Sequence, residues 1–234
     1  MTPETKRLAR LAGAAYVALG AATLVGYYHA PLVHADLEAT ARAITRSSDL
    51  RFRIGVIGDV LSTVLAVPLT LWLYRLFEPV HKTQAALMAL LLIVAMPISF
   101  VLALNYAAAR MLLSGAPELA ALAADQREAL GMLFLRVHAH GVLAEEIFWG
   151  LWLLPLGYLV IKSGFIPRVL GILLFVGGGA YVLHSLVSVF SGGERFVWYE
   201  RVTMLARGVG ELPIMLWLLI VGARVRRADS HAGS

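Results

Sequence analysis

The sequence of 234 residues contains no cysteine, which excludes disulfides, thiolate nucleophiles and zinc sites built on sulfur. Charged residues are also scarce, since Asp, Glu, Lys and Arg make up only 15% of the chain. A soluble domain of this length needs a largely polar surface, whereas 59% of these residues are hydrophobic and the mean hydropathy is +0.76. The composition therefore excludes an ordinary soluble protein and indicates a protein whose solvent is lipid.

Long apolar runs dominate what is present. A helix needs about 20 mainly apolar residues to cross a hydrocarbon core of about 30 Å, and the chain offers several such stretches. We predict an all-α fold, a polytopic membrane protein with a bundle of six transmembrane helices. A further interfacial helix is expected from Pro117 to about Leu130, followed by a bend or a continuation into the fourth span, because Ser114 can cap it and Glu118 suits its first turn. The six spans are expected at about residues 8–28, 53–76, 84–108, 130–161, 168–190 and 207–223.

The chain divides into one domain and a tail. We predict a single six-helix transmembrane domain over residues 1–223 and a basic, disordered cytoplasmic tail over residues 224–234. A surface loop with an amphipathic helix is expected over residues 29–50. The two three-helix halves show no convincing repeat, which weakens the interpretation as a transporter built from inverted repeats.

The formal net charge of +5 could suggest nucleic acid, but the Lys and Arg residues lie in short clusters beside apolar runs. Such clusters indicate contacts with lipid headgroups, so we expect membrane lipid and no nucleic acid as a partner. The short segments on the side of the termini hold all three lysines, Lys6, Lys82 and Lys162, with few acids. Unbalanced positive charge of this kind favours the cytoplasm. We predict a multi-pass protein of the inner (plasma) membrane with both termini cytoplasmic. The sequence leaves open whether it forms an oligomer or joins a membrane complex.

Seven short motifs, each of a different sequence, are spread through nearly the whole chain. They are residues 10–16 (RLAGAAY), 53–61 (RIGVIGDVL), 73–76 (LYRL), 157–159 (GYL), 163–171 (SGFIPRVLG), 210–211 (GE) and 216–219 (LWLL). Together they resemble a bacterial membrane-protein family catalogued as domain of unknown function 4386. The resemblance implies a small multi-helix membrane protein without an established activity. The segment from His138 to Glu146 has no counterpart in that pattern, so the resemblance implies no role for it.

A few ionisable side chains lie inside the apolar runs. Such groups cost several kcal/mol in lipid and normally face the bundle interior, a cavity or each other. At 1.5 Å per residue, four of them on four different helices are expected about 18 to 24 Å from the cytoplasmic helix ends, and two more fall at that level. This convergence predicts a polar, ligand-binding pocket in the outer half of the bilayer. The predicted ligand-binding residues are Asp59, Glu145, Glu146, His184, Arg207 and Glu211.

The alternative is that these residues form separate buried pairs that hold the helices together. Glu145 and His184 lie on segments joined by a short turn and are expected side by side. Arg207 and Glu211 are four residues apart on one helix and could neutralise each other.

The same residue types could bind a metal. Asp59, Glu145, His184 and Glu211 would be ligands for zinc, iron or manganese, and the metal could activate water. The local spacing does not support this, because the sequence has no His-Glu-x-x-His arrangement.

The leading hypothesis is a membrane protein that binds a small or lipidic ligand as a carrier, sensor or subunit. The alternatives are an intramembrane metal-assisted hydrolase and an accessory subunit of a membrane complex. Ligand, cofactor and catalytic residues are left unassigned.

Overall fold

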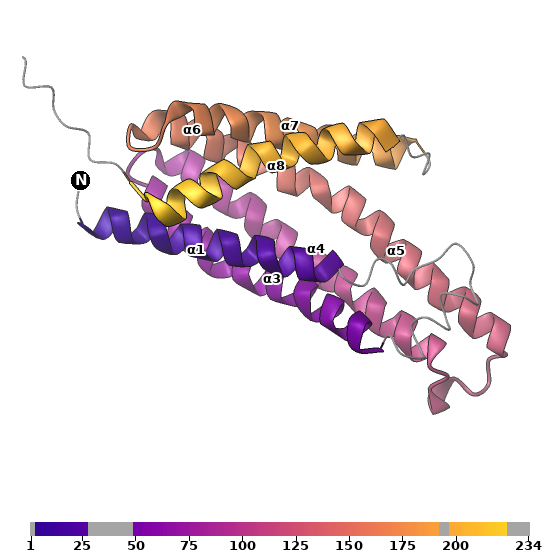
Figure 1. The fold of residues 1–234 in the computed structure, drawn as a ribbon. Coiled ribbons are helices and arrows are strands. Elements are labelled where there is room, and N and C mark those ends of the chain that lie inside the picture. Colours follow the sequence, from indigo (N-terminus) through magenta and orange to yellow (C-terminus); the bar gives the residue numbers. More distant parts are fainter. Residues whose placement is uncertain (1–2, 28–48, 192–196, 224–234) are drawn as a thin grey trace, which may run out of the picture.

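The computed structural model describes residues 3–27, 49–191 and 197–223, and in these ranges the chain is helical with no strand (Figure 1). Six helical spans are long and apolar enough to cross a membrane. The prediction of an all-α polytopic bundle is therefore confirmed. The expected amphipathic helix within residues 29–50 and the tail at 224–234 lie almost entirely outside the described residues.

The helices follow the apolar runs closely. One span, at residues 168–190, has the predicted bounds. A 3₁₀ turn at Pro117–Leu119 stands between α4 and α5. The helices are α1 (Pro3–Gly26), α3 (Asp49–Phe77), α4 (Lys82–Leu113), α5 (Ala124–Leu151), α6 (Leu153–Ser163), α7 (Arg168–Phe190) and α8 (Val197–Ile220).

The fourth span differs from the prediction. Pro117 begins only the 3₁₀ turn, and α5 begins at Ala124, where the Gln126 side chain accepts a hydrogen bond from the main-chain N–H of Ala123 at 3.1 Å. From there α5 is one continuous helix past Leu130 to Leu151, so of the two expected alternatives, a bend or a continuation, the structure has the continuation. The break comes at Trp152 instead, before α6. Pro155 explains it, because proline has no N–H to donate and its ring clashes with the carbonyl four residues earlier.

The sixth span also begins earlier than predicted, at Val197 rather than near residue 207. The polar residues of this first part, such as Glu200, lie ahead of the predicted span. They lie on a regular helix, where the Thr203 hydroxyl donates to the Tyr199 carbonyl at 2.9 Å. Polarity there reflects the surroundings of the helix and not the absence of one.

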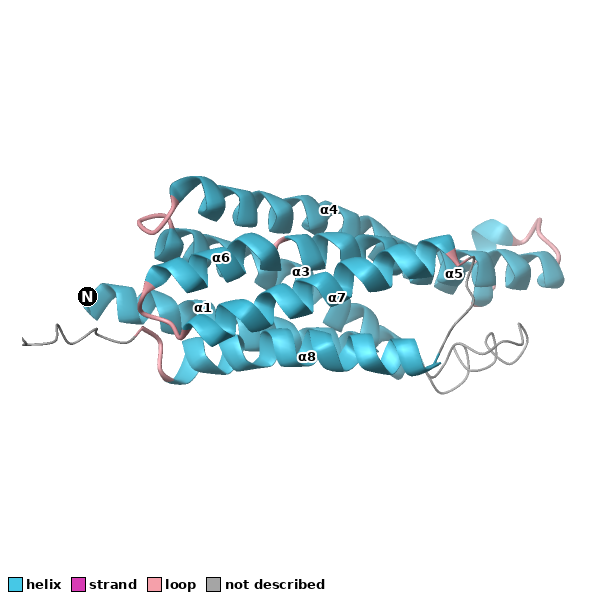
Figure 2. Ribbon diagram, turned by 90° about the horizontal axis from the view of Figure 1, so that it is seen from above, coloured by secondary structure: helices cyan, strands magenta, loops and turns pink. Residues whose placement is uncertain are grey.

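The helices form a closed ring in which neighbours in sequence are mostly neighbours in space. The order is α1, α3, α4, then α5 with α6, α7 and α8, and α8 returns to α1 (Figure 2). Arg10 Nη2 closes the ring by donating to the main-chain oxygen of Ile220 at 3.2 Å. We call this end of the bundle the basic end; it comprises residues 3–10, 78–82, 162–168 and 221–223.

Close helix approach depends on glycine pairs. A Cβ atom on Gly150 of α5 would lie 2.5 Å from the main-chain oxygen of Gly178 on α7. A Cβ on Gly177 would lie 3.0 Å from the Cα of Gly210 on α8. Small residues at crossings let backbones pack tightly, which matters in lipid because apolar side chains gain little by leaving it. These contacts hold α7 against both of its neighbours.

Candidate functional site

The centre of the polar region is a cluster of three side chains from three helices. Glu146 of α5 accepts one hydrogen bond from Arg207 Nη1 of α8, at 2.8 Å, and contacts His184 Nδ1 of α7 at 2.5 Å. Glu146 and His184 are 4% and 6% exposed. A carboxylate buried this deeply needs compensation, and Arg207 supplies it. The cluster therefore ties α5, α7 and α8 together through charge.

Glu211 lies on the same helix as Arg207 and is held by tyrosines. The hydroxyl of Tyr16, on α1, donates to Glu211 Oε2, and the hydroxyl of Tyr181, on α7, donates to the same carboxylate. The guanidinium of Arg207 stands over the ring of Tyr181, 5.0 Å from its centroid. Tyr181 thus connects the Glu211 contacts with the Glu146 cluster, so the polar network reaches α1 as well.

Glu145 is 2% exposed and faces α4. Its Oε1 accepts hydrogen bonds from the hydroxyl of Ser99 and from Trp149 Nε1, the latter at 3.3 Å. The carboxyl group is close enough to Asp59 and Glu146 for their charges to interact. Three acids from α3 and α5 consequently share one region of the bundle.

Asp59 differs from the other acids because its Oδ2 is buried and has no hydrogen-bond partner among the described residues. Its Oδ1 lies against Gly26, where a Cβ atom would collide with it. The hydroxyls of Ser62 and Thr63 donate to the main-chain oxygen of Asp59, at 2.8 and 3.1 Å, rather than to its carboxylate. The side chain therefore carries an unsatisfied acceptor.

Similarity to known proteins adds a family assignment to this geometry. Residues 11–222 match a family described as Domain of unknown function (DUF4386). The chain belongs to the DUF4386 family. It is also similar to an uncharacterized protein of Archaeoglobus fulgidus, with 33% identity over 84 residues. That match covers 36% of this chain and 48% of the relative, so the chain spans about half the length of the relative. No solved structure matches.

Family membership confirms the resemblance that the sequence motifs indicated, and with six candidate spans it makes the DUF4386 protein an integral membrane protein of unassigned function. The structure joins five of the six predicted ligand-binding residues by bonds and ring contacts, and places the sixth, Asp59, within electrostatic reach of Glu145. Whether they bind a ligand stays a prediction.

The pairing inside the cluster differs from the prediction. His184 contacts Glu146 and not Glu145. Arg207 bonds to Glu146, whereas Glu211 bonds to tyrosines. Consecutive residues of a helix point about 100° apart, so a shared level along the axis does not decide which side chains meet.

Sequence reasoning missed the neutral partners of the acids. Ser99, Tyr16 and Tyr181 each place a hydroxyl inside an apolar span. That placement is the only sequence signal for them, because their spacing does not connect them to any acid. The ring of Tyr199 stacks on His184 at 5.9 Å between centroids, a contact that the sequence did not indicate either.

The four possible metal ligands named from the sequence do not form one site. They are Asp59, Glu145, His184 and Glu211. In the ranges that the structure describes, no group of three or more His, Asp or Glu side chains could hold a metal ion. His184, Glu145 and Glu211 each have a different partner. His138 lies outside the network, with Nδ1 3.0 Å from the Leu102 main-chain oxygen. No observation therefore favours the metal-assisted hydrolase.

Proposed function

We propose that this DUF4386 protein binds a small or lipidic ligand in a polar site in the outer half of the bilayer, as a carrier, a sensor or a subunit of a membrane complex. The observation that carries the proposal is the buried Oδ2 of Asp59, which has no hydrogen-bond partner among the described residues. An unpaired acceptor in an apolar environment costs about 1–3 kcal/mol, so such an atom normally has a use. A ligand that donates a hydrogen bond to it would recover that energy.

The surroundings of Asp59 define the chemistry of the proposed ligand. Its carboxyl group lies within electrostatic reach of Glu145 and of the Tyr27 side chain at the end of α1, and Tyr27 in turn lies within reach of Glu146 and Arg207. The region therefore holds three acids against one arginine. Ionisable groups at this depth normally serve binding or transport when they are not fully paired. An amine or a polyhydroxylated headgroup, which offers several N–H or O–H donors, fits this excess of acceptors.

Tyr199 supports the same location. Its hydroxyl is buried and likewise has no hydrogen-bond partner among the described residues, and its ring stacks on His184 of the cluster. Two unsatisfied polar atoms, from α3 and α8, thus border one network. A ligand between them would bind both.

The orientation belongs to the same proposal. The basic end carries the two described termini and both short turns, and its lysines and arginines favour the cytoplasmic side of an inner (plasma) membrane. The polar network would then lie toward the outer leaflet. Protease added to intact cells should leave a tag after Ser234 uncut, and cleavage of that tag would reverse the orientation.

The binding test is mass spectrometry of molecules that co-purify with the protein in mild detergent. Asp59→Asn should fold and lose most of the retained ligand, because it removes the charged acceptor. Glu118→Gln is the matched control, since it makes the same carboxyl-to-amide change on an exposed 3₁₀ turn outside the spans. Equal ligand content in the wild type and the Asp59 variant, or no specific ligand in either, would overturn the proposal.

A further inference from the structure

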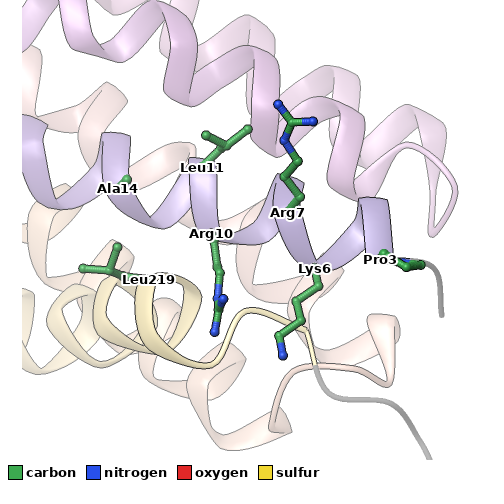
Figure 3. A pocket seen from close by; sticks show the side chains of 7 residues that line it. All are labelled: Pro3, Lys6, Arg7, Arg10, Leu11, Ala14 and Leu219. Atoms are coloured by element: carbon green, nitrogen blue, oxygen red, sulfur yellow. The ribbon is translucent and has the colours of Figure 1, made fainter.

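A second feature lies at the basic end, away from the polar network. A hollow of about 540 Å³ lies against α1 and the last turn of α8 (Figure 3). Lys6 and Arg10 point toward the end of α8, whereas Arg7 extends on the other side of α1. Among the described residues that line the hollow, none is acidic. Its described lining therefore has the charges of Lys6 and Arg10 on the α8 side and that of Arg7 on the other side of α1, with no acid among them.

The floor of the hollow is apolar. Leu11, Ala14 and Leu219 line it deeper in the bundle. Ala14 is one of the exposed residues, so this part of the hollow faces the position of the acyl chains. Two neighbouring cations, Lys6 and Arg10, beside an apolar, lipid-facing surface match a molecule with an anionic head and a hydrocarbon tail.

The backbone at this point is built for close approach. Gly222 follows α8 with φ at 71°, a left-handed conformation that favours glycine. A Cβ atom there would lie 3.2 Å from the main-chain oxygen of Lys6 and 3.4 Å from Arg10 Cγ. The bond from Arg10 Nη2 to Ile220 uses one of five guanidinium N–H groups. This contact fixes the arginine beside the hollow, and a guanidinium so placed suits a phosphate.

We propose that this hollow is a binding site for an anionic phospholipid, with Lys6 and Arg10 at the phosphate headgroup, Arg7 adding positive charge from the other side of α1, and the Leu11, Ala14 and Leu219 surface along an acyl chain. The site is independent of the ligand proposed for Asp59, because the two lie toward different ends of the bundle. It also differs from a general attraction to acidic membranes, because the apolar floor demands a tail as well as a charge.

The test uses the full chain purified in zwitterionic detergent and native mass spectrometry with phosphatidylglycerol as the probe and phosphatidylcholine as the comparison lipid. We expect the wild type to retain phosphatidylglycerol in preference. The triple variant Lys6→Gln, Arg7→Gln, Arg10→Gln should bind it at least about tenfold more weakly, because each cation near a lipid surface contributes to the attraction.

A matched control removes the same number of charges from the same end. Arg75, Lys162 and Arg168 are exposed and do not line the hollow, so changing all three to Gln should leave the preference for phosphatidylglycerol nearly intact. Equal loss in both triple variants would show a diffuse electrostatic effect and overturn the site.

A further variant tests the tail without changing any charge. Ala14→Phe fills the floor of the hollow and should weaken phosphatidylglycerol binding while leaving the thermal unfolding midpoint unchanged. Unaltered binding in this variant, or displacement of the lipid by millimolar inorganic phosphate alone, would mean that the tail is not bound and would overturn the assignment to a phospholipid. Neither result bears on Asp59, so this proposal and the proposed function fail separately.

Discussion

The half of the bundle next to the basic end and the layer beyond it are packed by different means. The first is an apolar core in which Leu73, Leu156 and Leu218 are 0% exposed. The second is the polar network, where Glu145, Glu146 and His184 are almost equally buried. Side-chain burial is similar in both, but only the second needs a polar or charged partner for its buried acids.

The difference shows what lipid demands of each kind of contact. Apolar side chains gain little by leaving hydrocarbon, so the apolar half depends on shape and on glycine crossings. Buried charges cannot be left in hydrocarbon unpaired, so the polar layer depends on specific partners. Substitutions in the apolar half should therefore change stability by altering side-chain packing, and substitutions in the polar layer should change it by removing a partner of a buried polar group.

The largest effect is expected at Glu146. Glu146→Ala leaves the guanidinium of Arg207 without its carboxylate, and breaking a buried pair in this way costs about 3–5 kcal/mol. Unfolding by denaturant in mixed micelles measures it. Adding Arg207→Met to Glu146→Ala should restore much of the stability, because no charge is then left unpaired. A double variant as unstable as the single one would show that the pair does not control this layer.

The glycine crossings should follow with a smaller effect. Gly150→Ala puts a methyl group against the main-chain oxygen of Gly178, and overpacking of this kind costs about 1–3 kcal/mol. Gly179→Ala is the control, because a Cβ atom there has open space within 4 Å. Its thermal midpoint should stay level or rise, since alanine favours a helix more than glycine does. Equal losses at both positions would indicate that helix approach is not the cause.

The pairing inside the polar layer can be measured by double-mutant cycles. Glu146→Gln with His184→Gln should show a coupling of about 0.5–3 kcal/mol, since the two side chains contact each other. Glu145→Gln with His184→Gln should be additive within about 0.5 kcal/mol, because Glu145 bonds to Ser99 and Trp149 instead. The reverse order of couplings would restore the pairing first expected from the sequence.

These contrasts also define what the sequence could predict. Apolar length and short turns were sufficient for the six spans, and α7 has the predicted bounds. The rise of about 1.5 Å per residue was sufficient to place Asp59 and Glu145 at a similar depth, and in the structure their carboxyl groups lie within electrostatic reach of each other. The partner of His184 depends on how each helix is rotated about its axis, and neither span length nor hydropathy carries that information. The break at Trp152 was missed although Pro155 signals it.

The smallest change in stability is expected at Asp59, and it is best judged against Glu145. Glu145→Ala removes the acceptor of Trp149 Nε1 and leaves a partly buried donor unpaired, which costs about 1–3 kcal/mol. Asp59→Asn removes no hydrogen bond from Oδ2, because that atom has no partner among the described residues, so the free energy of unfolding should change by less than about 0.5 kcal/mol. Both are read from the same denaturant titration of ligand-stripped protein. If Asp59→Asn lowers the free energy of unfolding as much as Glu145→Ala does, the Asp59 carboxylate stabilises the fold as Glu145 does, and the proposal that it binds a ligand loses its support.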